Sequence, residues 1–147
     1  MGERETVDWT RLREAARSAL DGLGSPPYAI WLYGSRASGT ENEESDFDFA
    51  IAADRRLELP ERQELRQRLE DALEVSGFGC PDLDVVDLQA VPLTLAAQVL
   101  ETGKILSCSD EVARAFLETR LMSMYASLNE ERREVVEAIV ERGRVYA

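Results

Sequence analysis

The chain has 147 residues, of which 44% are hydrophobic and 31% charged, and these values fit one globular domain with a modest core. Its formal net charge of −12 argues against a broad nucleic-acid surface, because such surfaces use clustered Lys and Arg, so we expect neither a templated polymerase nor a nucleic-acid partner. The absence of histidine excludes Ser-His-Asp and Cys-His catalysis, histidine zinc sites and any histidine-dependent ribonuclease mechanism.

Cysteine usage and hydropathy favour a cytoplasmic protein. Cys80 and Cys108 are too far apart in the sequence for a close metal pair, and two such cysteines are typical of reduced thiols in the cytoplasm. No apolar run approaches the roughly 18 residues that a membrane helix needs, so no membrane partner is expected. The acidity instead favours a basic protein partner.

Hydrophobic periodicity and turn residues predict alternating helices and strands in the first two thirds of the chain. Asp8 or Thr10 can cap a first helix, which Gly22 and Gly24 end. The predicted elements that follow are strands at about 28–33 and 46–53, a helix from about Pro60 to Gly77, a strand at about 83–88, a short helix between Pro92 and Gly103, and a strand or extended edge at 104–106. This order predicts an α/β (α+β) fold, a small mixed β-sheet of three to four strands flanked by helices.

The last third of the chain is helical in pattern to its end. Apolar residues at helical spacing predict one long helix up to about Leu128, and Asn129 is typical of the cap of a second helix that bears Val135, Val136, Ile139 and Val140. We therefore expect a single domain over 1–147, with a core at about 28–106 and C-terminal helices at about 110–145. The apolar stripes of these helices either pack on the sheet or serve in part as a partner surface.

The segment from Gly34 to Asp48 carries the chemistry. Gly34 and Ser35 follow a predicted strand, and ten residues separate Ser35 from Asp46 at the start of the next strand. Side chains alternate along a strand, so Asp46 and Asp48 share one face with Cα atoms about 6.5 Å apart. Asp84, between apolar residues of a later strand, can supply a third carboxylate. Three carboxylates suit two Mg²⁺ ions, which bind the phosphates of a nucleotide, activate an acceptor hydroxyl and stabilise a pyrophosphate leaving group.

Each of these features has a simpler explanation when it is taken alone. A Gly-Ser pair after a strand is usually only a turn, and acids at a strand entrance are usually solvated. Their occurrence together with Asp84, inside apolar strands, favours the metal site, because buried acids need partners. Arg36 either touches phosphate or is a surface arginine, and Lys104 either approaches a phosphate or is a helix-end cation.

The string GSRASGTENEESDFDFAI resembles the GSx10DxD signature of the DNA polymerase beta-like nucleotidyltransferases. LDVVDL at 83–88 resembles the third acidic strand of their minimal, single-domain members, the minimal nucleotidyltransferases (MNT). Of its two acids, Asp84 matches the family's position. Asp87 lies an odd number of residues after Asp84 on the same strand and therefore points to the opposite face. The resemblance covers about Tyr28 to Leu106 by motif and order, and it implies a polymerase beta-like fold.

The resemblance also implies a role for each matching residue. Gly34 lets the backbone approach the triphosphate, since a Cβ would hold it away, and Ser35 offers a hydroxyl and an N–H to the β and γ phosphates. Asp46 and Asp48 hold the nucleotide-bound Mg²⁺ and share a second ion with Asp84. Asp84 lies near the attacking hydroxyl and helps to remove its proton.

In this family the minimal enzyme is commonly the antitoxin partner of a small helical HEPN ribonuclease toxin. The resemblance therefore implies a Mg²⁺-dependent transfer of AMP from ATP to a tyrosine hydroxyl of a cognate HEPN toxin, which silences the ribonuclease. No residue pattern in the sequence indicates which nucleotide base the site recognises, so the choice of nucleoside triphosphate stays open. Two alternatives remain: transfer to a small molecule such as an aminoglycoside, for which the chain looks short, and a binding module that neutralises its partner by contact alone.

Overall fold

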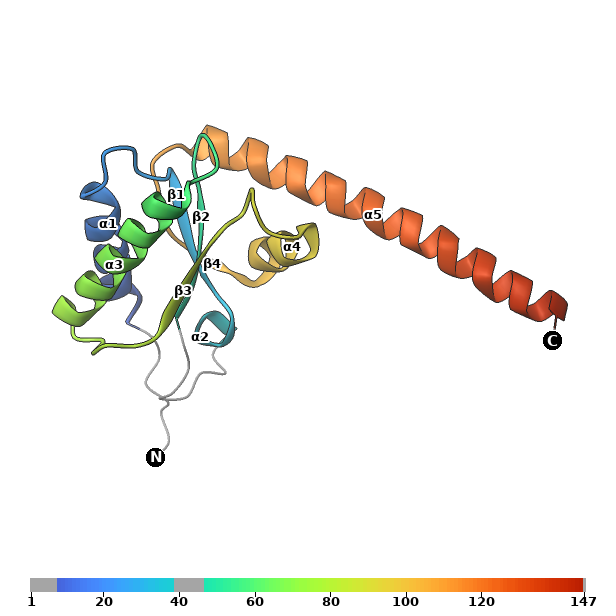
Figure 1. The fold of residues 1–147 in the computed structure, drawn as a ribbon, viewed down its shortest axis with the longest axis horizontal. Coiled ribbons are helices and arrows are strands. Elements are labelled where there is room, and N and C mark those ends of the chain that lie inside the picture. Colours follow the sequence, from blue (N-terminus) through green and yellow to red (C-terminus); the bar gives the residue numbers. More distant parts are fainter. Residues whose placement is uncertain (1–7, 39–46, 147) are drawn as a thin grey trace, which may run out of the picture.

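The computed structural model describes residues 8–38 and 47–146. In chain order its elements are α1 (Trp9–Asp21), β1 (Ala29–Tyr33), α2 (Ser35–Ser38), β2 (Phe47–Ala52), α3 (Leu59–Val75), β3 (Leu83–Asp87), α4 (Leu93–Thr102), β4 (Lys104–Cys108) and α5 (Glu111–Tyr146). Figure 1 shows a sheet between helices, with α5 projecting far from this body. The predicted elements of the core are present, and the short α2 is an addition to them.

The four strands form one mixed sheet in the order β3-β2-β1-β4. Strand β1 runs antiparallel to β2 and to β4, whereas β2 runs parallel to β3. Every residue of β1 is buried, as expected for the sequence AIWLY, because a central strand covered on both faces is apolar throughout. The predicted small mixed sheet is confirmed.

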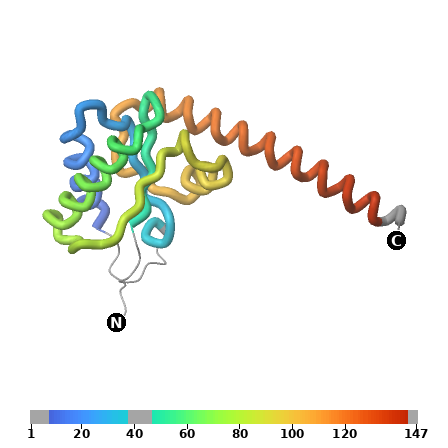
Figure 2. Tube along the Cα trace, in the orientation of Figure 1, coloured from blue at the N-terminus to red at the C-terminus, as the bar shows by residue number. Residues whose placement is uncertain are grey.

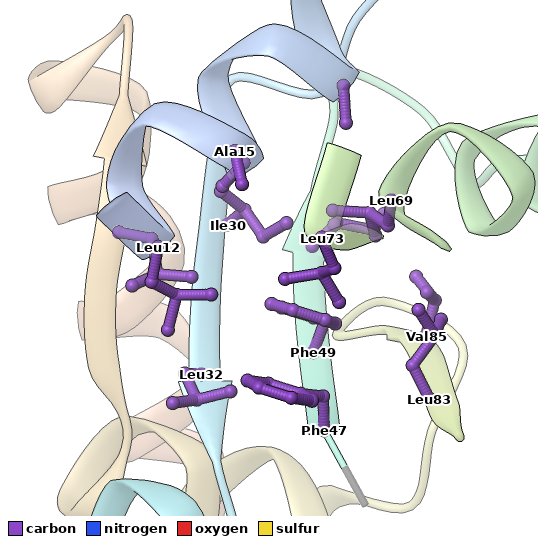
Figure 3. Packing of buried hydrophobic residues seen from close by; sticks show 14 of the residues in the cluster. Leu12, Ala15, Ile30, Leu32, Phe47, Phe49, Leu69, Leu73, Leu83 and Val85 are labelled. Atoms are coloured by element: carbon purple, nitrogen blue, oxygen red, sulfur yellow. The ribbon is translucent and has the colours of Figure 1, made fainter. Parts of the chain in front are cut away.

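Helices α1 and α3 cover one face of the sheet. Leu12 and Ala15 of α1 and Leu69 and Leu73 of α3 meet the strand side chains that point to this side, as Figure 3 shows. The strand residues in this cluster are Ile30, Leu32, Phe47, Phe49, Ile51, Leu83, Val85 and Leu106. Their period-two spacing is what assigns them to one face.

Helix α4 and the first turns of α5 cover the other face. The side chains in this second cluster include Trp31 and Tyr33 of β1 and Ala50 of β2. Leu117 and Leu121 of α5 are buried among them, at 5% and 7% exposure. This face therefore carries the alternate strand positions, including that of Asp48, which lies between Phe47 and Phe49 of the first cluster.

Local signals in the sequence set the ends of the helices. Of the two predicted caps of α1, the structure uses Asp8, whose carboxylate accepts the N–H of Arg11 at 3.2 Å. Helix α3 begins with a capping box between Glu58 and Glu61, with Pro60 in its first turn, as this residue's fixed φ favours.

The C-terminal third differs from its prediction, because α5 is one helix of 36 residues. The predicted break at Asn129 is wrong. Arg133 pairs with Glu130 at 2.5 Å and with Glu137 at 3.9 Å, and such pairs one turn apart support a continuous helix through this region. A polar residue that is favoured as a cap is also tolerated in a helix interior when its side chain faces solvent, as the exposed Asn129 does.

Both cysteines are free thiols, and neither is fully buried. Cys80 lies before β3 and Cys108 ends β4. In the part of the chain that the structure describes, no helix combines the length and apolar character needed to cross a bilayer.

Candidate active site

Three side chains form a row across the sheet at one end of β2. The parallel register places the Cα of Asp48 opposite that of Asp84, and the antiparallel register places Tyr33 of β1 opposite Asp48. Residues paired in this way direct their side chains to the same face. The Tyr33–Asp48–Asp84 row therefore lies on the face that α4 and α5 cover farther along the strands.

The electrostatics of the row agree with this geometry. The Tyr33 side chain is only 9% exposed, and burial followed by the negative charges of Asp48 and Asp84 raises the pKa of its hydroxyl to about 12. Asp48 is partly buried and Asp84 is exposed, with the Asp84 carboxylate accepting the N–H of Val85 at 3.0 Å. Two carboxylates side by side at an accessible edge concentrate negative charge and favour a bound cation.

The Gly34 turn lies directly against this row. Gly34 has φ of +77°, in the region that favours glycine, and a Cβ added there would come within 2.4 Å of an Asp48 carboxylate oxygen. Ser35 begins α2 immediately after the turn, and the N–H of Ala37 donates to the Gly34 carbonyl at 3.2 Å. The backbone predicted to approach a triphosphate is thus in contact with one of the predicted metal ligands.

Arg36 makes a contact that neither sequence alternative includes, and neither alternative is decided by it. Its guanidinium carbon lies 4.0 Å from the centre of the Phe47 ring, a cation–π contact. Phe47 belongs to the cluster under α1 and α3, so this contact lies on the face opposite to Asp48. It connects α2 to β2, the two elements that carry the candidate site, and a phosphate contact of Arg36 stays a prediction.

Lys104 lies at the same end of the sheet as the Gly34 turn. It begins β4 and pairs with Leu32, two residues before Gly34, and its side chain is exposed. Because Leu32 belongs to the cluster under α1 and α3, this pairing directs the Lys104 side chain to the face opposite to Asp48. A phosphate contact of Lys104 stays a prediction.

The predicted set of metal ligands is seen in part. Asp48 and Asp84 are brought together, whereas Asp46 lies outside the described residues. Among residues 8–38 and 47–146 there is no group of three or more His, Cys, Asp or Glu that could hold a metal ion. Two carboxylates still fit Mg²⁺, which commonly takes one or two from the protein and completes its octahedron with water and substrate phosphates.

Asp87 has a different environment from Asp84 on the same strand. It is 1% exposed, and its two carboxylate oxygens accept the N–H of Leu57 at 3.0 Å and that of Gln89 at 2.9 Å. The bond from Leu57 ties the end of β3 to the segment that leads into α3, and the bond from Gln89 fixes the turn after β3. The structure thus separates the two acids as their odd spacing predicts, and Asp87 is a structural residue.

Sequence reasoning missed Tyr33. A tyrosine that ends an apolar strand is usually an ordinary core residue, and only the strand register shows that it faces two carboxylates. Its position directly before Gly34 is the one signal that could have placed it at the site.

Comparisons with known proteins agree with the geometry. Residues 25–112 match the family model described as polymerase beta, nucleotidyltransferase. The chain is similar to the protein adenylyltransferase MntA of Shewanella oneidensis, with 33% identity over 111 residues that span 76% of this chain and 75% of MntA.

Solved structures give the same result. A chain from a crystal structure of a toxin–antitoxin with AMP-PNP superposes with a TM-score of 0.67 and 29% identity, over 91% of this chain and 99% of that one. A chain from the tri-AMPylated Shewanella oneidensis HEPN toxin in complex with MNT antitoxin has a TM-score of 0.65 and 26% identity, over 90% of this chain and 98% of that one. The four-stranded mixed sheet with its helices is thus the architecture of these chains.

Proposed function

The chain belongs to the polymerase beta nucleotidyltransferase family, and on that premise we propose that it transfers AMP from ATP to a tyrosine hydroxyl of a HEPN-domain toxin and thereby neutralises it. The observation that carries this proposal is the contact between the Gly34 turn and Asp48, with Asp84 opposite Asp48. A phosphate-binding turn and a pair of metal-binding carboxylates are the two parts that nucleotidyl transfer needs at one place.

The metal ligands in this proposal are Asp46, Asp48 and Asp84, holding two Mg²⁺ ions. The chemistry that Mg²⁺ supplies when bound is neutralisation of phosphate charge and a lower pKa for a coordinated hydroxyl. The described half of the site supports it, because Asp48 and Asp84 offer oxygen ligands side by side at an accessible edge.

The chain's own residues account for binding and orientation. Gly34 and Ser35 receive the triphosphate at the turn, where the absence of a Cβ makes room for the Asp48 carboxylate directly beside the backbone. The tyrosine oxygen of the acceptor attacks the α phosphorus of ATP, the bond from that phosphorus to the bridging oxygen breaks, and pyrophosphate leaves. Asp84, the most exposed member of the row, takes the proton of the attacking hydroxyl.

The partner follows from the relatives and from charge. The structure with a tri-AMPylated HEPN toxin contains a chain similar to this one over 90% of its length. The net charge of −12 favours association with a basic protein and opposes self-association. With two free thiols and no described helix that could span a membrane, a cytoplasmic location is part of the proposal.

The test uses the purified chain, labelled ATP, Mg²⁺ and a HEPN-domain protein from the same genome. We expect label on the HEPN protein and loss of its ribonuclease activity. Asp48→Asn should abolish both effects, whereas Asp54→Asn, an exposed acid just past the other end of β2, should leave them unchanged.

Other outcomes would favour the alternatives. Inhibition of the ribonuclease without label, unchanged in Asp48→Asn, would mean that the chain is a binding module. Label on an aminoglycoside and none on the HEPN protein would mean that the acceptor is a small molecule. Either result would reject the proposed transfer to a protein tyrosine.

A further inference from the structure

The distal half of α5 projects away from the body, as Figure 1 shows. From Asn129 to Gly143 every side chain is exposed, including Val135 at 57% and Ile139 at 61%. Isolated helices are marginally stable in water, and β-branched residues are poor helix formers. A helix that only faced solvent would therefore gain nothing from these exposed Val and Ile residues. Exposed aliphatic side chains that recur along a helix are typical of a binding surface.

The exposed stripe continues the buried face of the same helix. Val135 follows Leu117 by eighteen residues, and Ile139 follows Leu121 by the same number, which is about five turns at about 3.6 residues per turn. Side chains so spaced on a helix point in the same direction. Since Leu117 and Leu121 are buried against the body, Val135 and Ile139 face the side on which the body and α4 lie, about 27 Å farther along α5.

The stripe is continuous with a hollow of mixed polarity at the root of the helix. A cavity of about 440 Å³ lies between α4 and α5. Its lining includes Leu93 and Ala96 of α4 and Leu121 and Met124 of α5, and the polar side chains of Arg56, Gln89 and Arg120. Figures 1 and 2 show α5 leaving the body and passing beyond α4. The hollow and the stripe therefore lie on the same side of α5, the side turned toward α4.

This side of α5 lies over the face of the sheet that carries Asp48 and Asp84. Leu117 and Leu121 pack in the cluster of Ala50, and Asp48 points to the same face as Ala50, two residues later on β2. A protein that lies against α4 and the distal stripe is therefore on the correct side of the molecule to present a hydroxyl to the carboxylates.

The charges on either side of the stripe indicate what kind of helix can bind to it. Five glutamates and three arginines lie between Asn129 and Gly143, so the apolar stripe has an acidic border. A straight apolar stripe is best covered by a second helix, whose ridges fit its grooves. A second copy of this chain, with its own charge of −12, is a poor partner for such a border, whereas a basic helix is a good one.

We propose that the face of α5 containing Leu128, Val135 and Ile139, together with the hollow beside α4, is the docking site for a helix of the protein acceptor, an apolar helix flanked by Lys or Arg. This inference rests on the proposed function for the identity of the acceptor. The superposition with the toxin–antitoxin chain leaves about 13 of the 147 residues unmatched, fewer than half of the 36 residues of α5, so most of this helix has a counterpart there.

The test compares two double variants that each add two carboxylates to α5. Val135→Glu with Ile139→Glu changes the stripe. Ser123→Glu with Ala126→Glu changes exposed residues on the opposite side, because Ala126 follows Leu117 by nine residues, about two and a half turns. Both double variants should fold, because all four sites are exposed and because Glu is a better helix former than Val, Ile or Ser.

Binding of a HEPN-domain protein from the same genome is measured at equilibrium without ATP, and labelled transfer is measured separately. We expect the stripe variant to raise Kd at least tenfold and the opposite-face variant to change it less than twofold. We expect binding to the parent chain to weaken as salt rises. Asp48→Asn should bind like the parent chain and fail only in transfer.

Equal binding by the two double variants, or no binding by the parent chain, would overturn the docking site. A parent dimer in sedimentation that the stripe variant dissociates would also overturn it, because a second copy would then cover the stripe. If the stripe variant loses binding and the parent chain transfers no label, the docking site stands and the proposed transferase activity is rejected.

Discussion

The two ends of the β2–β3 pair use aspartate in opposite ways. Asp87 is 1% exposed, and both of its carboxylate oxygens accept backbone N–H groups. Asp48 and Asp84, at the other end, lie opposite each other at an accessible edge beside the Gly34 turn. A buried carboxylate with fixed donors stabilises the fold, whereas two adjacent carboxylates near solvent repel each other and favour a cation.

This difference separates stability from function within one strand pair. The end with Asp48 and Asp84, the proposed active end, places two carboxylates side by side near solvent. The structural end supplies a bond that helps to hold the segment before α3. Substitutions at the two ends should therefore change different measured quantities, activity at one end and the free energy of unfolding at the other.

The largest effect is expected at the active end. Asp84→Asn should lower the rate of transfer on the order of a thousandfold, about 4 kcal/mol in the barrier, because it removes a carboxylate from the proposed metal site and the proposed proton acceptor of the attacking hydroxyl. The melting temperature should stay the same or rise, since repulsion with Asp48 is relieved. Single-turnover rates and thermal unfolding of the same preparation check both parts, and a lower melting temperature would contradict the comparison.

The next effect depends on pH and on Tyr33. The pKa of its hydroxyl is about 12 in the folded chain against an ordinary value of 10.0, so folding favours the protonated form. This contribution to stability is complete below pH 10.0 and is lost as the pH rises to about 12. A shift of this size corresponds to on the order of 2 to 3 kcal/mol.

We therefore expect the free energy of unfolding of the metal-free chain to fall more steeply over this pH range than that of Tyr33→Phe. In Asp84→Asn the difference should shrink, because Asp84 is one of the charges that raise the pKa of Tyr33. Denaturant unfolding at a series of pH values measures it. Parallel curves for the parent chain and Tyr33→Phe would show that the row is not electrostatically coupled.

Much of this comparison could be predicted from the sequence, for a physical reason. The spacing from Gly34 to Asp48 and the apolar strands are local patterns, and the odd separation of Asp84 and Asp87 already places them on different faces. The pairing of β2 with β3 could not be read in the same way. Register is set by contacts across the sheet, so the position of Tyr33 opposite Asp48 had no local signal.

Two other features escaped prediction for different reasons. The Arg36–Phe47 contact joins two residues on either side of a long polar segment, and a sequence gives no measure of that approach. The break expected at Asn129 is one weak local preference, and other local preferences override it, namely the surrounding ion pairs and helix formers.

A smaller effect is expected at the structural end. Asp87→Asn should lower the free energy of unfolding by about 2 kcal/mol, because an amide nitrogen then faces a backbone N–H that the carboxylate used to accept. The transfer rate per folded molecule should remain that of the parent chain. Denaturant unfolding and an assay at low temperature distinguish the two quantities, and a lost rate in a fully folded variant would give Asp87 a role at the site.

A loss of stability smaller than that of Asp87→Asn, and the sharpest test of the active end, is expected from Gly34→Ala. Its φ of +77° makes alanine strained by about 1 to 2 kcal/mol, and the new Cβ would come within 2.4 Å of an Asp48 oxygen. Gly79→Ala is a matched control, because Gly79 has the same φ and nothing within 4 Å of the added Cβ. Both variants should lose similar stability, but only Gly34→Ala should also lose at least about tenfold in transfer rate, since it alone displaces a metal-binding carboxylate. Equal transfer rates in the two variants would mean that the closeness of the turn to Asp48 does not matter for catalysis.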